Sequence, residues 1–169
     1  MTVIKPMIYN VDKIELCSRG VFMRVYLDNC CYNRPYDDQT PLKIQMETLS
    51  KLQIQQEIRQ GKIELASSYI LEAENAANPF ERKRVDIQSF IDENTKIFVS
   101  EARDKEVRDI ASEIMKTGIR LMDACHIACA MLAHCDVLLS TDSRVLKYKT
   151  DKLQISNPAA FILERGSEK

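Results

Sequence analysis

The sequence predicts an α/β fold, a three-layer α/β/α sandwich with a central parallel sheet. Short apolar runs alternate along the chain with longer segments in which apolar residues recur at helical spacing, and this alternation is typical of parallel sheets. One run, Val137-Leu138-Leu139, is apolar on consecutive residues, as expected for a strand buried on both faces. At 169 residues the chain has the length of one domain, which we place at residues 23–165.

The expected elements begin with a strand over 23–28, which ends in Asp28. Thr40 and Pro41 then predict a helix, with Thr40 as its cap and Pro41 at the first helical position. Gly61 closes this helix as a C-terminal cap. Its apolar residues recur at helical spacing: Leu42, Met46, Leu49 and Ile58. Further strands are expected over 63–66, 97–99, 137–139 and 153–155, and further helices begin near residues 68, 79, 101, 123, 143 and 157.

Residues 1–22 show no clear periodicity, and two interpretations of them stay open. They form a genuine N-terminal strand or arm, or they are upstream sequence translated ahead of a natural start at Met23. The second interpretation arises because Arg19-Gly20 can be encoded by a purine-rich codon pair that resembles a ribosome site. Mass spectrometry of the native protein decides between them, since an intact terminus at Met1 or Thr2 would end the second.

The composition excludes several classes of protein. With 24 basic and 25 acidic residues the formal net charge is −1, so a surface for nucleic acid must be a local patch. The sequence contains no run of about 18 apolar residues, so no membrane span is predicted. It has no apolar block near the N-terminus, so no signal peptide is predicted. We therefore expect a cytoplasmic protein whose six cysteines are reduced thiols. The four glycines form no G-x-G-x-x-G pattern, which disfavours a dinucleotide-binding fold.

Four acidic residues are expected where a strand is followed by a helix or in the first turns of helices. They are Asp28, Asp123 and Asp142, with Glu74 or Glu72 as the fourth. In a parallel sheet such positions converge at one edge. Clustered carboxylates repel one another, and Mg²⁺ or Mn²⁺ is the natural cation among them. A metal beside a phosphate suits phosphodiester hydrolysis. The alternative for each aspartate is a capping role and for each glutamate a solvated helix face. Spacing alone is a weak signal, and the joint placement of all four acids strengthens it.

The arrangement resembles the PIN-domain nucleases, whose bacterial members include the VapC-type toxins. The resemblance covers residues 23–157, and its most specific part is the segment from Gly118 to Ala130, which contains Asp123-Ala124-Cys125-His126-Ile127-Ala128. Three weaker motifs support it. They are Val25-Tyr26-Leu27-Asp28-Asn29, Ser68-Tyr69-Ile70-Leu71-Glu72-Ala73-Glu74-Asn75 and Leu138-Leu139-Ser140-Thr141-Asp142.

This resemblance implies a PIN-like fold and a metal-dependent single-strand ribonuclease that leaves 3′-hydroxyl and 5′-phosphate ends. By motif position, it implies that the catalytic and metal-binding acids are Asp28, Glu74, Asp123 and Asp142, with Glu72 as the fallback for Glu74. The family's hydroxyl before the last acid falls on Ser140 or Thr141. Single-stranded RNA is the implied partner, and an antitoxin protein or a second copy of the chain are further partners that the resemblance allows. The long helices over 40–60 and 79–93 favour a stand-alone PIN-domain protein over a minimal toxin.

Further residues are expected to contact the substrate. The resemblance implies Ser140 and Thr141, and Asn29, Arg34 and Arg82 are added because they flank Asp28 or carry positive charge. Arg82 begins the cluster Arg82-Lys83-Arg84, for which a solvated helix face is the alternative. His126 lies one turn after Asp123. We expect it to be a packed helix histidine, with a general acid–base role as the alternative.

The main alternative to a nuclease is a catalytically silent domain that binds RNA or a protein partner, in which the acids are only caps. Saturable Mn²⁺ binding separates the two, since a silent domain lacks such a site. A hydrolase with an acid nucleophile is disfavoured, because Asn29-Cys30-Cys31 follows Asp28 with no second acid two residues on.

Overall fold

A computed structural model describes residues 9–10 and 22–167 and confirms the three-layer α/β class. Within these residues six strands form one sheet in the order β1-β4-β3-β2-β5-β6, and all neighbouring strands run parallel. The strands are β1 (Tyr9–Asn10), β2 (Met23–Leu27), β3 (Ile63–Ser68), β4 (Thr95–Val99), β5 (Val137–Leu139) and β6 (Gln154–Ser156). The five strands expected from the sequence are all present.

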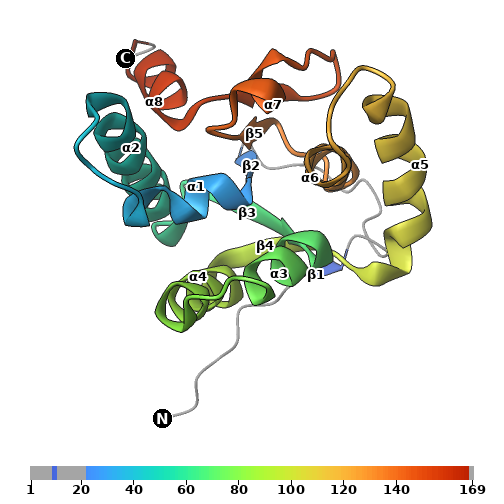
Figure 1. The fold of residues 1–169 in the computed structure, drawn as a ribbon, viewed down its shortest axis with the longest axis horizontal. Helices are drawn as coiled ribbons and strands as arrows, with labels where there is room; N and C mark the ends of the chain where they lie inside the picture. Colours follow the sequence, from blue (N-terminus) through green and yellow to red (C-terminus); the bar gives the residue numbers. More distant parts are fainter. Residues whose placement is uncertain (1–8, 11–21, 168–169) are drawn as a thin grey trace.

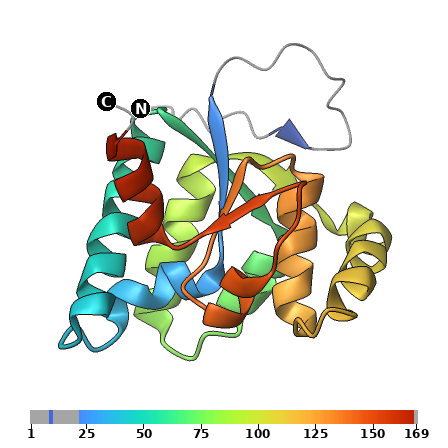
Figure 2. The ribbon, with the colours of Figure 1, turned by 90° about the horizontal axis from the view of Figure 1, so that it is seen from above.

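Helices cover both faces of the sheet. They are α1 (Asn29–Asn33), α2 (Leu42–Arg59), α3 (Tyr69–Ala76), α4 (Glu81–Asn94), α5 (Asp104–Met115), α6 (Leu121–Leu132), α7 (Ser143–Lys147) and α8 (Pro158–Ser167), with short 3-10 turns at η2 (Arg34–Tyr36) and η3 (Glu101–Arg103). Figure 1 shows α2 and α8 side by side on one flank and α5 beside α6 on the other. In Figure 2, α1, α3 and α7 gather where β2 ends. The short helices therefore mark the carboxyl edge of the sheet, where sites form in such folds.

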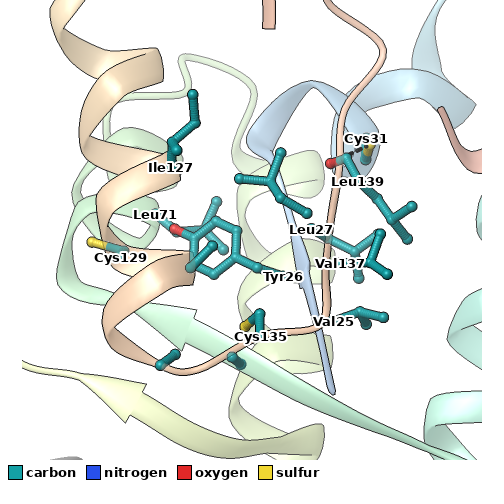
Figure 3. Close-up of a cluster of buried hydrophobic side chains, with 14 of the residues drawn as sticks. Val25, Tyr26, Leu27, Cys31, Leu71, Ile127, Cys129, Cys135, Val137 and Leu139 are labelled. Atoms are coloured by element: carbon teal, nitrogen blue, oxygen red, sulfur yellow. Dashed lines mark hydrogen bonds between the residues drawn. The ribbon is translucent and has the colours of Figure 1, made fainter. Parts of the chain in front are cut away.

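The core is centred on β2, whose neighbours are β3 and β5. Val25 is in register with Leu65 of β3 and Val137 of β5, and all three side chains are buried. Consecutive residues of β2 and β5 are buried, because helices pack on both sides of the sheet. Figure 3 shows the Tyr26 ring between β2 and α6, close to Leu71. Tyr26 thus carries a polar hydroxyl into the apolar layer beneath the carboxyl edge.

The orientation of α2 is the main surprise of the fold. Three of the four apolar residues that predicted this helix point outward, with Leu42 69%, Met46 45% and Leu49 68% exposed, and the fourth, Ile58, is buried. Glu47 and Lys51 occupy the buried side instead, 1% and 5% exposed. The helical spacing identified the helix correctly, but it did not identify the face that packs against the rest of the protein.

The ends of α2 confirm one expected cap and correct the other. Gly61 follows the helix with φ of 70°, and its N–H donates to the carbonyl of Ile58, as a glycine cap does. At the start, the expected cap Thr40 is wrong, because Pro41 is the N-cap and α2 begins at Leu42. The Thr40 hydroxyl donates to Asp38 Oδ1 at 2.6 Å and so belongs to the preceding turn.

Near the N-terminus, Tyr9 and Asn10 pair in parallel with Ile97 and Phe98 of β4. The remainder of the 1–22 segment, apart from Phe22, lies outside the described residues, so the hypothesis of a natural start at Met23 stays a prediction. Five cysteines of the described part are not in disulfide bonds, and four of them are buried. None of the helices described is long and apolar enough to cross a membrane.

Candidate metal centre at the carboxyl edge of the sheet

Two neighbouring strands place the first acid. Because β2 and β5 are paired, Asp28 at the end of β2 lies beside residues 140–142 at the end of β5, and its N–H donates to the carbonyl of Leu139 at 3.0 Å. Ser140 Oγ donates to Asp28 Oδ2 at 2.8 Å and accepts the Asp142 N–H at 3.1 Å. Asp28 and Ser140 are both buried. The Asp28 carboxylate is therefore held in one orientation by a buried hydroxyl.

Two helices complete a cluster around Asp28. Glu74 from α3 and His126 from α6 approach it, and the Nε2 atom of His126 lies 2.7 Å from Glu74 Oε2 and 3.9 Å from Asp28 Oδ1. One ligand atom from each of the three residues lies within 4.8 Å of the other two. Two carboxylates and one imidazole form a donor set that suits a divalent cation. We call Asp28, Glu74 and His126 the carboxylate–histidine cluster.

In this cluster, Glu74 and His126 each stabilise the charged form of the other. Burial by itself raises the pKa of Glu74, but the hydrogen bond and the charge of His126, together with Asn29, bring it below its ordinary value. Burial lowers the pKa of His126, and the Glu74 hydrogen bond and the charge of Asp28 outweigh that effect and raise it. Both directions favour a negative Glu74 that accepts a hydrogen bond from Nε2–H of a positive His126.

A chain of hydrogen bonds holds His126 from behind. Its Nδ1 atom lies 2.9 Å from the Tyr26 hydroxyl, and that hydroxyl lies 2.7 Å from Ser68 Oγ. Ser68 is the N-cap of α3 and accepts the N–H of Leu71 at 3.2 Å. All these groups are buried. The same serine that caps α3 therefore also fixes the ring that faces Glu74 on α3.

Asp123 lies in the first turn of α6 and is coupled to the cluster by charge. Burial, followed by the negative charges of Asp28 and Asp142, raises its pKa. The repulsion from Asp28 and Asp142 is the part of this shift that a bound cation would relieve.

Asp142 has a different set of contacts, because it is the N-cap of α7. Its Oδ1 accepts the N–H of Arg144 at 2.8 Å, and its Oδ2 lies 2.7 Å from Arg144 Nη2. These bonds to Arg144 hold the pKa of Asp142 below its ordinary value. The structure thus brings Asp28, Glu74 and Asp123 into one charged region, with Asp142 at its border in an ion pair.

The two glutamates of α3 face different neighbours. Glu74 contacts His126, whereas Glu72 is near α4, where burial followed by the charge of Asp92 raises its pKa. Residues two apart on a helix lie on different faces. The geometry therefore favours Glu74 over Glu72 as the fourth acid.

The residues expected to contact substrate are spread over different surroundings. Asn29 lies beside Glu74, and Ser140 and Thr141 are buried at the end of β5. The guanidinium of Arg34 forms two ion pairs: Nη1 lies 2.9 Å from Asp37 Oδ2, and Nε lies 2.9 Å from Glu47 Oε2. Arg82 is exposed on α4. Arg34 therefore has a structural role that its position in the sequence did not suggest.

Two residues of the site were not among the expected ones. Cys30 Sγ donates to Asp28 Oδ2 at 3.3 Å and accepts the Thr141 N–H at 3.3 Å, and Tyr26 supports His126. His126 is packed in the helix layer as expected, 2% exposed, but it faces the acids. Its place three residues after Asp123, on one side of a helix, is the signal in the sequence that points to this position.

Comparisons with known proteins give a likeness of fold only. The sequence matches no protein-family model and no curated protein significantly. The structure is similar to a chain of VapBC2 from Rickettsia felis bound to a promoter DNA fragment, with 12% identity over 80% of this chain and 98% of that chain and a TM-score of 0.49. It is also similar to a chain of FitAcB from Neisseria gonorrhoeae, with 16% identity, coverage of 79% and 97%, and a TM-score of 0.47. Likeness at this level carries no argument about activity.

Proposed function

We propose that the chain is a divalent-metal-dependent endoribonuclease that hydrolyses phosphodiester bonds of single-stranded RNA. The observation that carries this proposal is the carboxylate–histidine cluster, whose donor atoms lie within 4.8 Å of one another at the carboxyl edge of a parallel sheet. The choice of RNA, and of 5′-phosphate products, comes from the sequence resemblance to PIN-domain nucleases.

The residues present fit a divalent ion. Asp28 and Glu74 supply oxygens, and Asp123 adds a third carboxyl group close enough to Asp28 for that charge, after burial, to help raise the pKa of Asp123. A bound ion in such a site activates a water and stabilises the leaving oxygen of a phosphodiester. Ser140 keeps Asp28 turned toward the site, and Asp142 and Asp123 orient the attacking water in this proposal. Because the attacking group in this proposal is a water molecule, no nucleophilic side chain is required.

Cleavage of a labelled single-stranded RNA by the full chain tests the proposal, with Mn²⁺ or Mg²⁺ present and with the metal removed by a chelator. We expect cleavage only with metal. Asp123→Asn should abolish it while leaving the circular dichroism and thermal unfolding unchanged, because an amide has nearly the same size and shape as this half-buried carboxylate. Full activity in this variant rejects the assigned site.

The pair Glu74→Gln and Glu72→Gln provides a matched control on one helix. Glu74 faces His126 and Glu72 faces α4, so we expect the first variant to lose cleavage and the second to keep it. Equal loss in both variants would show that the activity depends on α3 in some other way. Saturable metal binding without cleavage would leave the silent RNA- or protein-binding domain as the better interpretation.

The roles of an antitoxin, a homodimer and a cytoplasmic location remain predictions from the sequence. Copurification of a tagged chain from its native source tests for a bound partner protein. A small partner protein that suppresses RNA cleavage when added to the purified chain would support the toxin role, and cleavage that no copurifying protein suppresses would favour a stand-alone nuclease.

A further inference from the structure

We propose that His126 is itself a ligand of the metal ion, through Nε2, and that the site for this reason prefers a first-row transition ion such as Mn²⁺ or Co²⁺ over Mg²⁺. This inference rests on the metal site of the proposed function, but it does not depend on RNA being the substrate. It concerns the nitrogen donor, which a site built of carboxylates alone does not offer.

The distances around Nε2 suit a shared ion. Ligand atoms that are each about 2.1 Å from one ion lie roughly 3–4.2 Å apart from one another. Nε2 of His126 is 3.9 Å from Asp28 Oδ1 and 2.7 Å from Glu74 Oε2. The second distance is a hydrogen bond from Nε2–H, so on metal binding that proton passes to solvent and the Glu74 carboxylate turns aside to leave room for the ion.

The surroundings of the other ring nitrogen make ligation by Nε2 feasible. A metal-bound histidine donates its second ring N–H to a fixed partner, which orients the ring. The Tyr26 hydroxyl lies 2.9 Å from Nδ1, and a hydroxyl both accepts and donates. When Nδ1–H donates to Tyr26, the Tyr26 hydroxyl donates in turn to Ser68 Oγ, 2.7 Å away. Once Nε2 has lost its proton, its lone pair faces the side of the ring on which Asp28 and Glu74 lie.

The chemistry of the donors determines the choice of ion. Carboxylate oxygens bind Mg²⁺ and Mn²⁺, whereas imidazole suits transition ions, whose affinity for nitrogen sites rises from Mn²⁺ through Co²⁺. The His126 ring is 2% exposed, so it does not turn away into solvent when a hard ion enters. Mg²⁺ is thus offered one donor that it binds poorly, while Mn²⁺ and Co²⁺ use all three.

A competing interpretation gives His126 a purely structural role, in which Nε2–H only anchors Glu74. Electron spin-echo measurements on the full chain loaded with Mn²⁺ separate the two, because they detect nitrogen bound directly to the ion. The chain has only two histidines, His126 and His134, so labelling histidine with ¹⁵N is selective. His134 is exposed at the end of α6 with φ of 52°, a conformation that asparagine tolerates, and His134→Asn is therefore the matched control.

We expect a nitrogen signal that changes on ¹⁵N labelling in the wild type and in His134→Asn, and that is absent in His126→Asn. Calorimetry should show Mn²⁺ affinity falling at least about tenfold in His126→Asn, with a smaller loss for Mg²⁺. Tyr26→Phe, which removes the support of Nδ1, should weaken Mn²⁺ binding by about 10–100-fold. The wild-type spectrum decides the matter even if His126→Asn does not fold.

Bound Mn²⁺ without a nitrogen signal in the wild type overturns the ligand assignment, whether or not RNA is cleaved. A nitrogen signal without cleavage supports the ligand and refutes the nuclease. The absence of any saturable Mn²⁺ binding refutes both the ligand and the metal site.

Discussion

Replacing Lys51 with methionine should stabilise the protein near neutral pH. Lys51 lies on the buried side of α2, 5% exposed, and burial lowers its pKa to about 8 from an ordinary 10.5. The titratable groups that act on it are Cys31, whose ionised form would oppose this shift, and Arg59, which adds to it. At about 1.36 kcal/mol per pH unit, the buried charge costs about 3 kcal/mol of folding free energy. Methionine keeps the apolar stem and removes the charge.

The sign of the pH dependence follows from the two pKa values. Below pH 8 the lysine is protonated in both the folded and the unfolded chain, and the folded state carries the full cost. Between pH 8 and 10.5 the unfolded chain binds more protons than the folded one, so stability rises with pH. The advantage of Lys51→Met should therefore fall from about 3 kcal/mol at pH 7 to about 1 kcal/mol at pH 10.

Urea unfolding followed by circular dichroism at pH 7 and pH 10 measures this advantage. Part of it is offset by the loss of the contact between the Lys51 ammonium and the Tyr32 ring, 5.7 Å from its centroid, which is worth about 0.5–1 kcal/mol. Lys62→Met, at an exposed position, is the control and should change stability by less than about 0.5 kcal/mol. A destabilised Lys51→Met, or an advantage that is equal at both pH values, would refute the reasoning.

Two further substitutions test the buried polar contacts. Arg34→Ala should cost about 3–5 kcal/mol of unfolding free energy, because it leaves Glu47, 1% exposed, without its arginine partner at 2.9 Å; a loss below about 1 kcal/mol in denaturant unfolding would contradict this. Ser140→Ala should weaken Mn²⁺ binding by about tenfold or more, because Asp28 loses a hydrogen bond of 2.8 Å. Unchanged affinity in calorimetry would show that the hydroxyl does not orient Asp28.

The order of strands and helices could be predicted because local signals agree with the fold. The apolar run over 137–139 is β5, and the glycine at 61 ends α2 as expected. The orientation of α2 could not be predicted, since helical spacing identifies a helix but not its buried face. Glu47 can be buried because its carboxylate forms an ion pair with Arg34 and accepts a hydrogen bond from Asn157 Nδ2. Asn157 is 110 positions away in the sequence.

The sequence predicted the carboxyl edge of the sheet as the position of the candidate site, but it did not predict the contacts among the candidate residues. Asp28 at the end of a strand and Asp123 at the start of a helix indicate the carboxyl edge of the sheet. The choice between Glu72 and Glu74 depends on the rotation of α3, and this rotation is fixed by tertiary packing. The support of His126 by Tyr26 spans 100 positions, and no local pattern records such a contact.

Calorimetric titration of the metal-free chain with Mn²⁺ tests the central claim most directly. We predict one saturable site in the wild type and in Glu72→Gln, and its loss in Glu74→Gln. Equal binding in all three proteins, or none in the wild type, would contradict the assignment of Asp28, Glu74 and His126 as a metal centre.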